Sequence, residues 1–149
     1  MNRIKYDSDS MKLMTLFESM TGAKVKDCIA NDRHARLAGD SLANSLIFVI
    51  EENEMGKAIG KNGVNIKRME NMLKKKIKLI EFSSDVLQFV KNVIYPIEVS
   101  EIVREDNVIK IHGKDTGTKA MLIGRERQNI NHLSDIVKRY FDIREIKVE

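Results

Sequence analysis

An internal repeat with a period of about 64 residues limits the possible folds of this chain more than any other feature. The matched positions at an offset of 64 are Ile59-Gly60 with Ile123-Gly124, Asn65-Ile66 with Asn129-Ile130, and Met69 with Leu133. Ile77 matches Ile143 at an offset of 66, so the second copy has about two extra residues before its last strand. Repetition at this period indicates two copies of one structural module. We therefore expect a first module over residues 1–82 and a second over 83–149, packed together because each is small.

Hydrophobic periodicity predicts the same order of elements in both modules: helix, strand, strand, short helix, longer helix, strand. In the first module we expect a helix capped by Ser8 or Asp9 and ending at Gly22, a strand over 24–29, a loop over 31–44, a strand over 46–50, a helix over 55–59, a helix from about 63 to 73, and a strand over 77–82. The continuous apolar run 46–50 predicts a strand buried on both faces. Alternation in the preceding strand places Val25, Asp27 and Ile29 on one side.

In the second module the first helix is expected to be stopped by Pro96, because proline cannot continue a helix. The other expected features are a cap at Ser83 or Ser84, strands over 97–104 and 107–113 joined across Glu105-Asp106, helices over 116–123 and 127–141, and a strand over 143–148. The short segment 113–117 resembles a phosphate loop but lacks its spacing, so we interpret it as a turn that caps the next helix.

The most informative segment joins the last two helices of the first module through Gly60-Lys61-Asn62-Gly63. Gly60 ends a helix at a point where a left-handed conformation costs little only for glycine. Gly63 lets a ligand approach the backbone and is expected to leave the N–H groups of the next helix free as an anion site. Lys61 adds a positive charge at the tip. Together these features suit a clamp on a sugar-phosphate backbone.

We expect base selection in a narrow groove beside this loop, wide enough for unstacked bases and too narrow for a duplex. Candidates for its apolar floor are Ile59, Ile66 and Val49, and candidates for contacts with base edges are Asn65 and Lys67. These predictions define a single-stranded nucleic-acid site in the first module.

The distribution of charge along the chain also indicates that this segment binds a ligand. Between Lys57 and Lys78 there are eight basic residues and a single acidic one, Glu70, and Lys57 and Arg68 join the expected binding residues. Residues 1–82 carry a net charge of +4 and residues 83–149 a net charge of zero. Such an excess in one segment is typical of a surface that binds a polyanion. For residues 74–76, all lysine, a solvated helix end and a flanking phosphate contact both stay open.

The corresponding loop of the second module departs from this pattern. It consists of Gly124, Arg125, Glu126 and Arg127, so the closing glycine is absent and a carboxylate is present. We expect close backbone approach to be hindered there, although Arg125 and Arg127 offset the negative charge. The second module is therefore expected to bind weakly, to extend a path begun by the first, or to be structural.

These features resemble the KH domain, whose Gly-X-X-Gly loop clamps nucleic-acid backbone. The element order resembles the type II arrangement, and the tandem modules with residues 55–63, Met-Gly-Lys-Ala-Ile-Gly-Lys-Asn-Gly, resemble the archaeal-type NusA family. The resemblance implies an α+β fold, with three helices on a small mixed three-stranded sheet in each module. It also implies single-stranded RNA binding, a non-catalytic role in transcription elongation, termination or antitermination, and association with RNA polymerase, whose direct contact stays open.

Other classes of function find little support. Cys28 is the sole cysteine and is interpreted as a small buried hydrophobe, and His34, His112 and His132 do not cluster. We expect no cofactor, no metal, no membrane segment, a cytoplasmic location and a monomer. The alternatives are a KH protein of ribosome assembly or RNA processing, a small nuclease, for which the carboxylates are too scattered, and a structural protein with a vestigial loop. RNA and single-stranded DNA both remain possible ligands.

Overall fold

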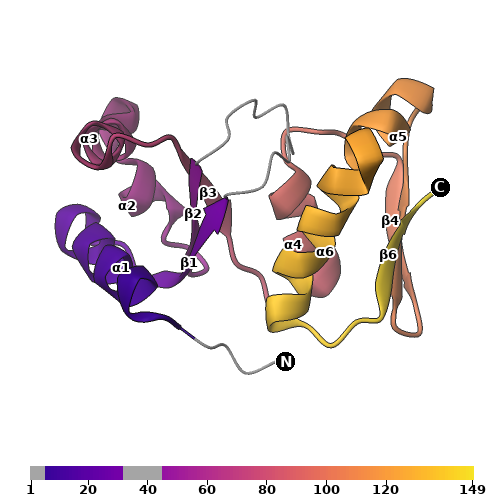
Figure 1. The fold of residues 1–149 in the computed structure, drawn as a ribbon, viewed down its shortest axis with the longest axis horizontal. Coiled ribbons are helices and arrows are strands. Elements are labelled where there is room, and N and C mark those ends of the chain that lie inside the picture. The colour runs from indigo at the N-terminus through magenta and orange to yellow at the C-terminus, as the bar shows by residue number, and fades with distance from the viewer. Residues whose placement is uncertain (1–5, 32–44) are drawn as a thin grey trace. The chain divides into compact units, whose positions relative to one another are not determined.

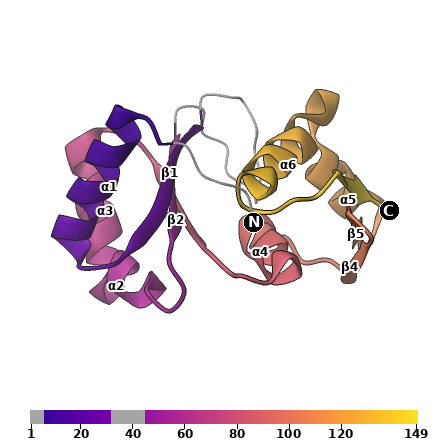
Figure 2. The same ribbon diagram turned by 90° about the horizontal axis from the view of Figure 1, so that it is seen from below.

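The computed structural model describes residues 6–31 and 45–149, which fall into two compact units. Among these residues the first unit contains 6–31 and 45–83, and the second contains 84–149. Each unit is an α+β module with its own three-stranded sheet (Figures 1 and 2). None of the helices in the described part of the chain has both the length and the apolar character that crossing a bilayer requires.

The first unit forms a mixed sheet covered by helices on one face (Figure 2). Its elements are α1 (Ser8–Thr21), β1 (Val25–Asn31), β2 (Ser45–Ile50), α2 (Met55–Ile59), the 3₁₀ turn η2 (Lys61–Gly63), α3 (Val64–Leu73) and β3 (Ile77–Glu81). Strand β2 lies between β1, which is antiparallel to it, and β3, which is parallel. Because parallel strands need a crossover connection, α2 and α3 supply it, and the Gly60–Gly63 loop lies at its midpoint.

The second unit repeats this topology. Its elements are α4 (Val86–Ile94), β4 (Glu101–Glu105), β5 (Val108–His112), α5 (Thr116–Ile123), the 3₁₀ turn η3 (Arg125–Arg127), α6 (Gln128–Tyr140) and β6 (Glu145–Val148). Strand β5 is central, antiparallel to β4 and parallel to β6. Helix α6 has 13 residues where α3 has 10. Strand β6 begins 68 residues after β3, so the extra length before the last strand is larger than the two residues expected. The predicted fold class of two modules with mixed three-stranded sheets is confirmed.

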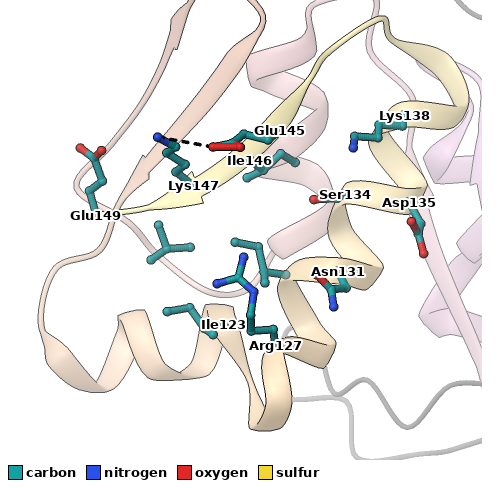
Figure 3. Close-up of a pocket in the computed structure, with 12 residues that line it drawn as sticks. Ile123, Arg127, Asn131, Ser134, Asp135, Lys138, Glu145, Ile146, Lys147 and Glu149 are labelled. Atoms are coloured by element: carbon teal, nitrogen blue, oxygen red, sulfur yellow. Dashed lines mark ion pairs between the residues drawn. The ribbon is translucent and has the colours of Figure 1, made fainter.

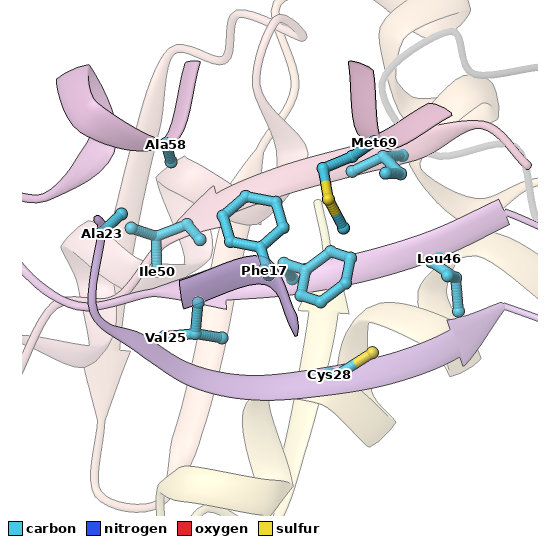
Figure 4. Close-up of a cluster of buried hydrophobic side chains, with 10 residues drawn as sticks. Phe17, Ala23, Val25, Cys28, Leu46, Ile50, Ala58 and Met69 are labelled. Carbon is cyan, nitrogen blue, oxygen red and sulfur yellow. The ribbon is translucent and has the colours of Figure 1, made fainter. Parts of the chain in front are cut away.

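Aromatic contacts anchor the core of each unit. In the first, Phe17 of α1 stacks on Phe48 of β2 with ring centroids 4.5 Å apart. Ala58 of α2 and Met69 of α3 belong to the same cluster (Figure 4), so three helices share one face of the sheet. In the second, Phe89 of α4 meets the ring of Tyr140 of α6 edge-on at 5.4 Å. Every residue of β2 is buried, which confirms the prediction for the run 46–50.

The predicted N-cap of the first helix in each unit was wrong by one or two residues. Asp7, not Ser8 or Asp9, caps α1 by accepting a hydrogen bond from the N–H of Ser10 at 2.7 Å. Asp85, not Ser83 or Ser84, caps α4 by accepting from Leu87 at 3.1 Å. Several polar residues precede each helix, and the one whose carboxylate reaches the second or third N–H is selected by geometry. The cap predicted for the segment 113–117 is confirmed, since Asp115 accepts from the N–H of Thr118.

Strand ends differ more from the predictions than helix ends. Strand β4 begins at Glu101 instead of Ile97, and β6 begins at Glu145 instead of Ile143. The hairpin turns at Asp106-Asn107, with Asp106 at a φ of 54°, because Glu105 pairs with Val108. Residue 31 ends β1, and the remainder of the predicted loop, 32–44, lies outside the described residues, as does His34.

A β-bulge changes which residues of β1 face the core. The register against β2 shifts between Val25 and Asp27, so Val25 and Cys28 enter the same hydrophobic cluster. Strict alternation had placed Val25 with Asp27 and Ile29, and this prediction was wrong because an extra residue reverses the side that each following side chain faces. Cys28 is 3% exposed, as predicted for a small buried hydrophobe.

Candidate nucleic-acid interface

The loop from Gly60 to Gly63 is an exposed turn between α2 and α3, held by three residues with positive φ. Gly60 has φ 76° and ψ 172°, Asn62 has φ 57°, and Gly63 has φ 73°. The conformation of Gly60 belongs to a region that only glycine populates readily. The side chains of Lys61 and Asn62 are exposed at the tip. The loop therefore presents one cationic and one amide side chain on a fixed backbone.

Two backbone N–H groups of this loop are available to a ligand. The amides of Lys61 and Asn62 have no acceptor among the described residues. The prediction that the free amides begin the next helix was wrong for Val64, whose N–H donates to the carbonyl of Lys61, while Gly63 donates to Gly60 at 3.1 Å. The tight 3₁₀ turn uses these amides internally and leaves the two before them free. Adjacent free N–H groups beside a lysine suit a phosphate oxygen.

Asn65 stabilises the loop by linking the two helices that flank it. Its side-chain amide donates to the carbonyl of Lys57 at 2.8 Å and so ties the first turn of α3 to α2. A Cβ atom at Gly60 would lie 2.8 Å from this amide, so the glycine also makes room for it. The side chain that we expected at base edges thus has a structural contact within the protein.

Gly63 differs from Gly60 in its surroundings. A Cβ atom there would meet only Ile66 at 3.7 Å and Lys67 at 3.9 Å, which are ordinary van der Waals distances. The fold therefore requires a positive φ at Gly63, but a Cβ atom at this position would cause no steric clash.

The second loop adopts the same backbone conformation despite its different sequence. Gly124, Glu126 and Arg127 have φ values of 74°, 55° and 62°, close to those of the first loop. Asn129 donates to the carbonyl of Met121 at 2.7 Å, as Asn65 does to Lys57. The substitution of the closing glycine has not changed the path of the backbone, so the two loops differ in side chains alone.

The other predicted binding residues of the first module lie around the loop in different environments. Lys67 and Arg68 are exposed on α3, and Ile59 is 39% exposed at the end of α2. Ile66 is partly buried against the core. Val49 is fully buried in β2, so the prediction that it contributes to the floor of an open groove was wrong. Every residue of β2 is buried, so this strand offers no accessible surface to a ligand.

Lys57 is exposed and pairs with Glu54 at 3.4 Å, on the helical turn before the loop. The N–H of Lys24 donates to the same carboxylate at 3.0 Å. This hydrogen bond, helped by Lys57, holds the pKa of Glu54 below its usual value. Glu54 therefore stays ionised and links the start of α2 to the start of β1.

A groove of about 670 Å³ follows α6 in the second unit (Figure 3). One wall is formed by Arg127, Ile130, Asn131 and Ser134, and the other by residues 145–149 at the edge of the sheet, with Ile123 at one end. The sequence reasoning placed Arg127 in the site but missed the strand wall. Pairing of β6 with β5 brings that wall opposite the helix, and no local pattern reveals such pairing.

The first unit has a smaller hollow, of about 420 Å³, on the matching face of α3. Lys67, Glu70, Asn71 and Lys74 line it, and at an offset of 64 they correspond to Asn131, Ser134, Asp135 and Lys138 of the larger groove. Lys75 and Lys76 complete the lining. Each module therefore carries a depression along the same side of its long helix.

Charge distinguishes the two depressions. The hollow of the first unit has four lysines and one carboxylate, which gives a net charge of +3. The groove of the second unit has three cations, Arg127, Lys138 and Lys147, against Asp135, Glu145 and Glu149, and Lys147 pairs with Glu145 at 3.4 Å. The larger groove is thus electrically balanced. Since a nucleic-acid strand is attracted mainly through its phosphates, the first unit is the better polyanion site.

No group of three or more potential metal-binding side chains comes together within residues 6–31 and 45–149. His112 lies in β5 and the buried His132 in α6. The arrangement around the first loop offers hydrogen-bond donors and positive charge, which are the chemical requirements for holding a phosphodiester backbone.

Known proteins resemble this chain in sequence and in fold. A family model described as the KH domain matches residues 15–99. Three relatives are each called probable transcription termination protein NusA. The protein of Methanococcus vannielii is 35% identical, with 98% of this chain and 80% of that protein covered. The protein of Methanocaldococcus jannaschii is 29% identical, with 99% and 76% covered, and that of Thermoplasma acidophilum is 28% identical, with 100% and 98% covered.

One solved structure has the same fold over nearly the whole chain. The crystal structure of APE1850 aligns with a TM-score of 0.71 and 26% sequence identity, covering 97% of this chain and 100% of that one. The agreement extends through both units.

Proposed function

The chain belongs to the archaeal NusA family and contains a KH domain, and from this premise we propose that it binds single-stranded RNA through Gly60–Gly63 during transcription. As a member of this family it is a non-catalytic transcription termination protein. The finer roles in elongation and antitermination belong to the proposal. So do a cytoplasmic location, a monomeric state and the domain boundary between residues 82 and 83.

The observation that supports the proposal is the pair of free amides at Lys61 and Asn62. They lie between two positive-φ glycines, on the only one of the two modules with a net positive charge. Backbone N–H groups recognise a phosphate oxygen without regard to base identity. The loop then supplies affinity and position, and selection of bases falls to the side chains that flank it.

Four residues beside the loop are suited to that second task. Ile59 presents apolar surface for stacking against a base, and Lys67 and Arg68 present donors from α3. Ile66 fills the space between these side chains and the core. In the second module Gly124, Arg125 and Arg127 correspond to the loop residues Gly60, Lys61 and Gly63, and we propose that they add weaker contacts.

A paired substitution tests the proposal. K61D/N62D places two carboxylates where the phosphate would lie, and we expect the affinity for a single-stranded oligoribonucleotide to fall more than about tenfold, or about 1.4 kcal/mol. Aspartate tolerates the left-handed conformation that Asn62 adopts, so the fold is retained. Binding is measured by fluorescence anisotropy and folding by circular dichroism.

The matched control is R125D/E126D, which builds the same acidic pair into the second loop. Because that loop is attached to a balanced module, the loss of affinity should be clearly smaller. Equal losses from both variants would contradict the assignment of the first loop as the main site. An unchanged affinity in K61D/N62D would remove the proposal altogether.

The transcriptional setting is tested by recovering the protein from native lysate with its bound RNA and proteins. Recovery of RNA polymerase subunits and nascent transcripts is the expected result. Recovery of ribosome-assembly intermediates in their place would favour the alternative role in RNA processing.

A further inference from the structure

A hollow along α3 has a net charge of +3 and lies outside the Gly60–Gly63 loop. It is lined by Lys67, Glu70, Asn71 and Lys74–Lys76 and has a volume of about 420 Å³. The four lysines are exposed, and none of them forms an ion pair with the residues that the structure describes. By contrast, Lys57, Lys110, Lys114 and Lys147 each pair with a glutamate. Within residues 6–31 and 45–149, the hollow thus gathers four lysines that no carboxylate pairs with.

Glu70 has a structural task in this hollow. Its carboxylate accepts a hydrogen bond from the N–H of Ile77 at 3.0 Å, which ties α3 to the first residue of β3. The intervening lysines are therefore held on a closed turn, whose first residue, Lys74, has a φ of 55°. A fixed turn lowers the backbone entropy that is lost when its side chains bind a ligand.

The helix dipole accounts for Lys74 at the C-cap of α3 more than for Lys75 and Lys76 beyond it. Cations are favoured within the last turn of a helix, and the effect falls off beyond it. The last turn of α3 contains no basic residue, and the lysines begin at its C-cap. At an offset of 64, Lys74, Lys75 and Lys76 correspond to Lys138, Arg139 and Tyr140, so two of the three positions are basic in the second module as well. Arg139 does not line the groove of the second unit, and carboxylates in that lining balance its cations. The lining therefore has a net positive charge in the first unit and none in the second.

Helix length sets the distance between the hollow and the loop. The ten residues of α3 span about 15 Å at a rise of 1.5 Å per residue. A stacked strand rises about 3.4 Å per nucleotide, so this length corresponds to about four nucleotides, or fewer where the strand is extended. A KH loop clamps about four nucleotides. A strand held at the loop and running along α3 therefore reaches the hollow as it leaves that segment.

We propose that Lys74, Lys75 and Lys76 form a second phosphate site, which holds the same RNA strand beyond the nucleotides clamped by the loop. The inference rests on the proposed function, since the strand must first be bound at Gly60–Gly63. The lysines act on the backbone and add affinity without adding sequence preference.

Oligoribonucleotides of four and eight nucleotides separate the two sites. An octamer offers more positions at which four nucleotides can bind than a tetramer does, and this alone raises its affinity by a statistical factor. The wild-type protein should favour the octamer by more than that factor. K75Q/K76Q should keep the affinity for the tetramer and abolish the increase on lengthening. The slope of log affinity against log salt for the octamer should become shallower by about 1.4, at about 0.7 for each phosphate that the variant no longer neutralises. K12Q/K24Q, which removes the same charge from elsewhere in the first module, is the control and should keep the increase.

The possible outcomes are distinct. If K75Q/K76Q retains the increase in affinity, or if K12Q/K24Q abolishes it equally, the lysines are a solvated helix end and the inference fails. Weaker tetramer binding by K75Q/K76Q would also contradict it, because the lysines would then belong to the loop site. Failure of the proposed function looks different, since the wild-type protein would then bind neither oligonucleotide and the amide resonances of Lys61 and Asn62 would not move.

Discussion

At Gly60 two independent constraints exclude other residues. Its φ of 76° with ψ of 172° is a glycine conformation, and the amide of Asn65 occupies the space that a side chain would need. Gly124 meets the same two constraints, with Asn129 as close as 2.6 Å to its hypothetical Cβ. The first glycine and the asparagine five positions later therefore act as one unit, which shapes the loop in both modules.

The two glycines of the first loop should respond differently to alanine. G60A should lower the free energy of unfolding by about 3 kcal/mol, because a strained φ and the clash with Asn65 add together. G63A should cost about 1 kcal/mol of unfolding free energy for its left-handed φ. We also expect it to weaken RNA binding, because a methyl group on the turn hinders close approach of a nucleic-acid backbone. Urea denaturation and oligoribonucleotide titration separate these effects. Equal losses of stability would show that Gly63 is also required by the fold.

Elements that depend on near neighbours were predicted more accurately than those that depend on distant ones. The bounds of α2 and α5 agree with the predictions at both ends, since the stop signals at Gly60 and Gly124 are local. The starts of β4 and β6 were misplaced, because pairing partners far along the chain decide where a strand begins. The bulge in β1 belongs to the same class, and it places Cys28 in the core.

Burial of Cys28 has a consequence for the pH dependence of stability. Desolvation, with a further contribution from Asp27, raises the pKa of the thiol to about 12. The unfolded thiol has a pKa of about 8.5, so above this value the unfolded chain releases a proton that the folded chain keeps. The thiol's contribution to stability is therefore complete below about pH 8.5 and is lost as the pH rises toward 12.

Comparison with C28A isolates this effect from other groups that titrate at high pH. Between pH 7 and pH 10 the wild-type protein should lose about 2 kcal/mol of unfolding free energy more than C28A, at about 1.4 kcal/mol for each pH unit above 8.5. Urea denaturation at each pH, followed by circular dichroism, measures the difference. Parallel losses in the two proteins would mean that the thiol ionises normally in the fold.

Across the whole chain, two modules with one topology carry different charges. Residues 1–82 have a net charge of +4 and residues 83–149 have none, although both loops share a backbone conformation. Duplication has thus kept the scaffold and changed its surface. We therefore base the proposed preference for the first loop on this difference in charge more than on the shape of either loop.

Restoring the motif in the second module tests this interpretation. In the K61D/N62D background, E126N/R127G changes the second loop to Gly-Arg-Asn-Gly. We expect only a small part of the missing RNA affinity to return, because the groove beside that loop has balanced charge. The affinity is measured at low and moderate salt. Full recovery would indicate that the loop alone determines binding and that the charge of the module has little effect.

The sequence by itself determined the duplicated module, the order of its elements, the site of the loop and the charged segment around it. All of these depend on residue type and short-range spacing. Tertiary structure alone decided that Lys61 and Asn62 carry the free amides and that Asn65 bonds to the carbonyl of Lys57. It also decided that Val49 is fully buried and that the second loop has the conformation of the first. The physical reason is that hydrogen-bond satisfaction and burial are settled by groups that only folding brings together.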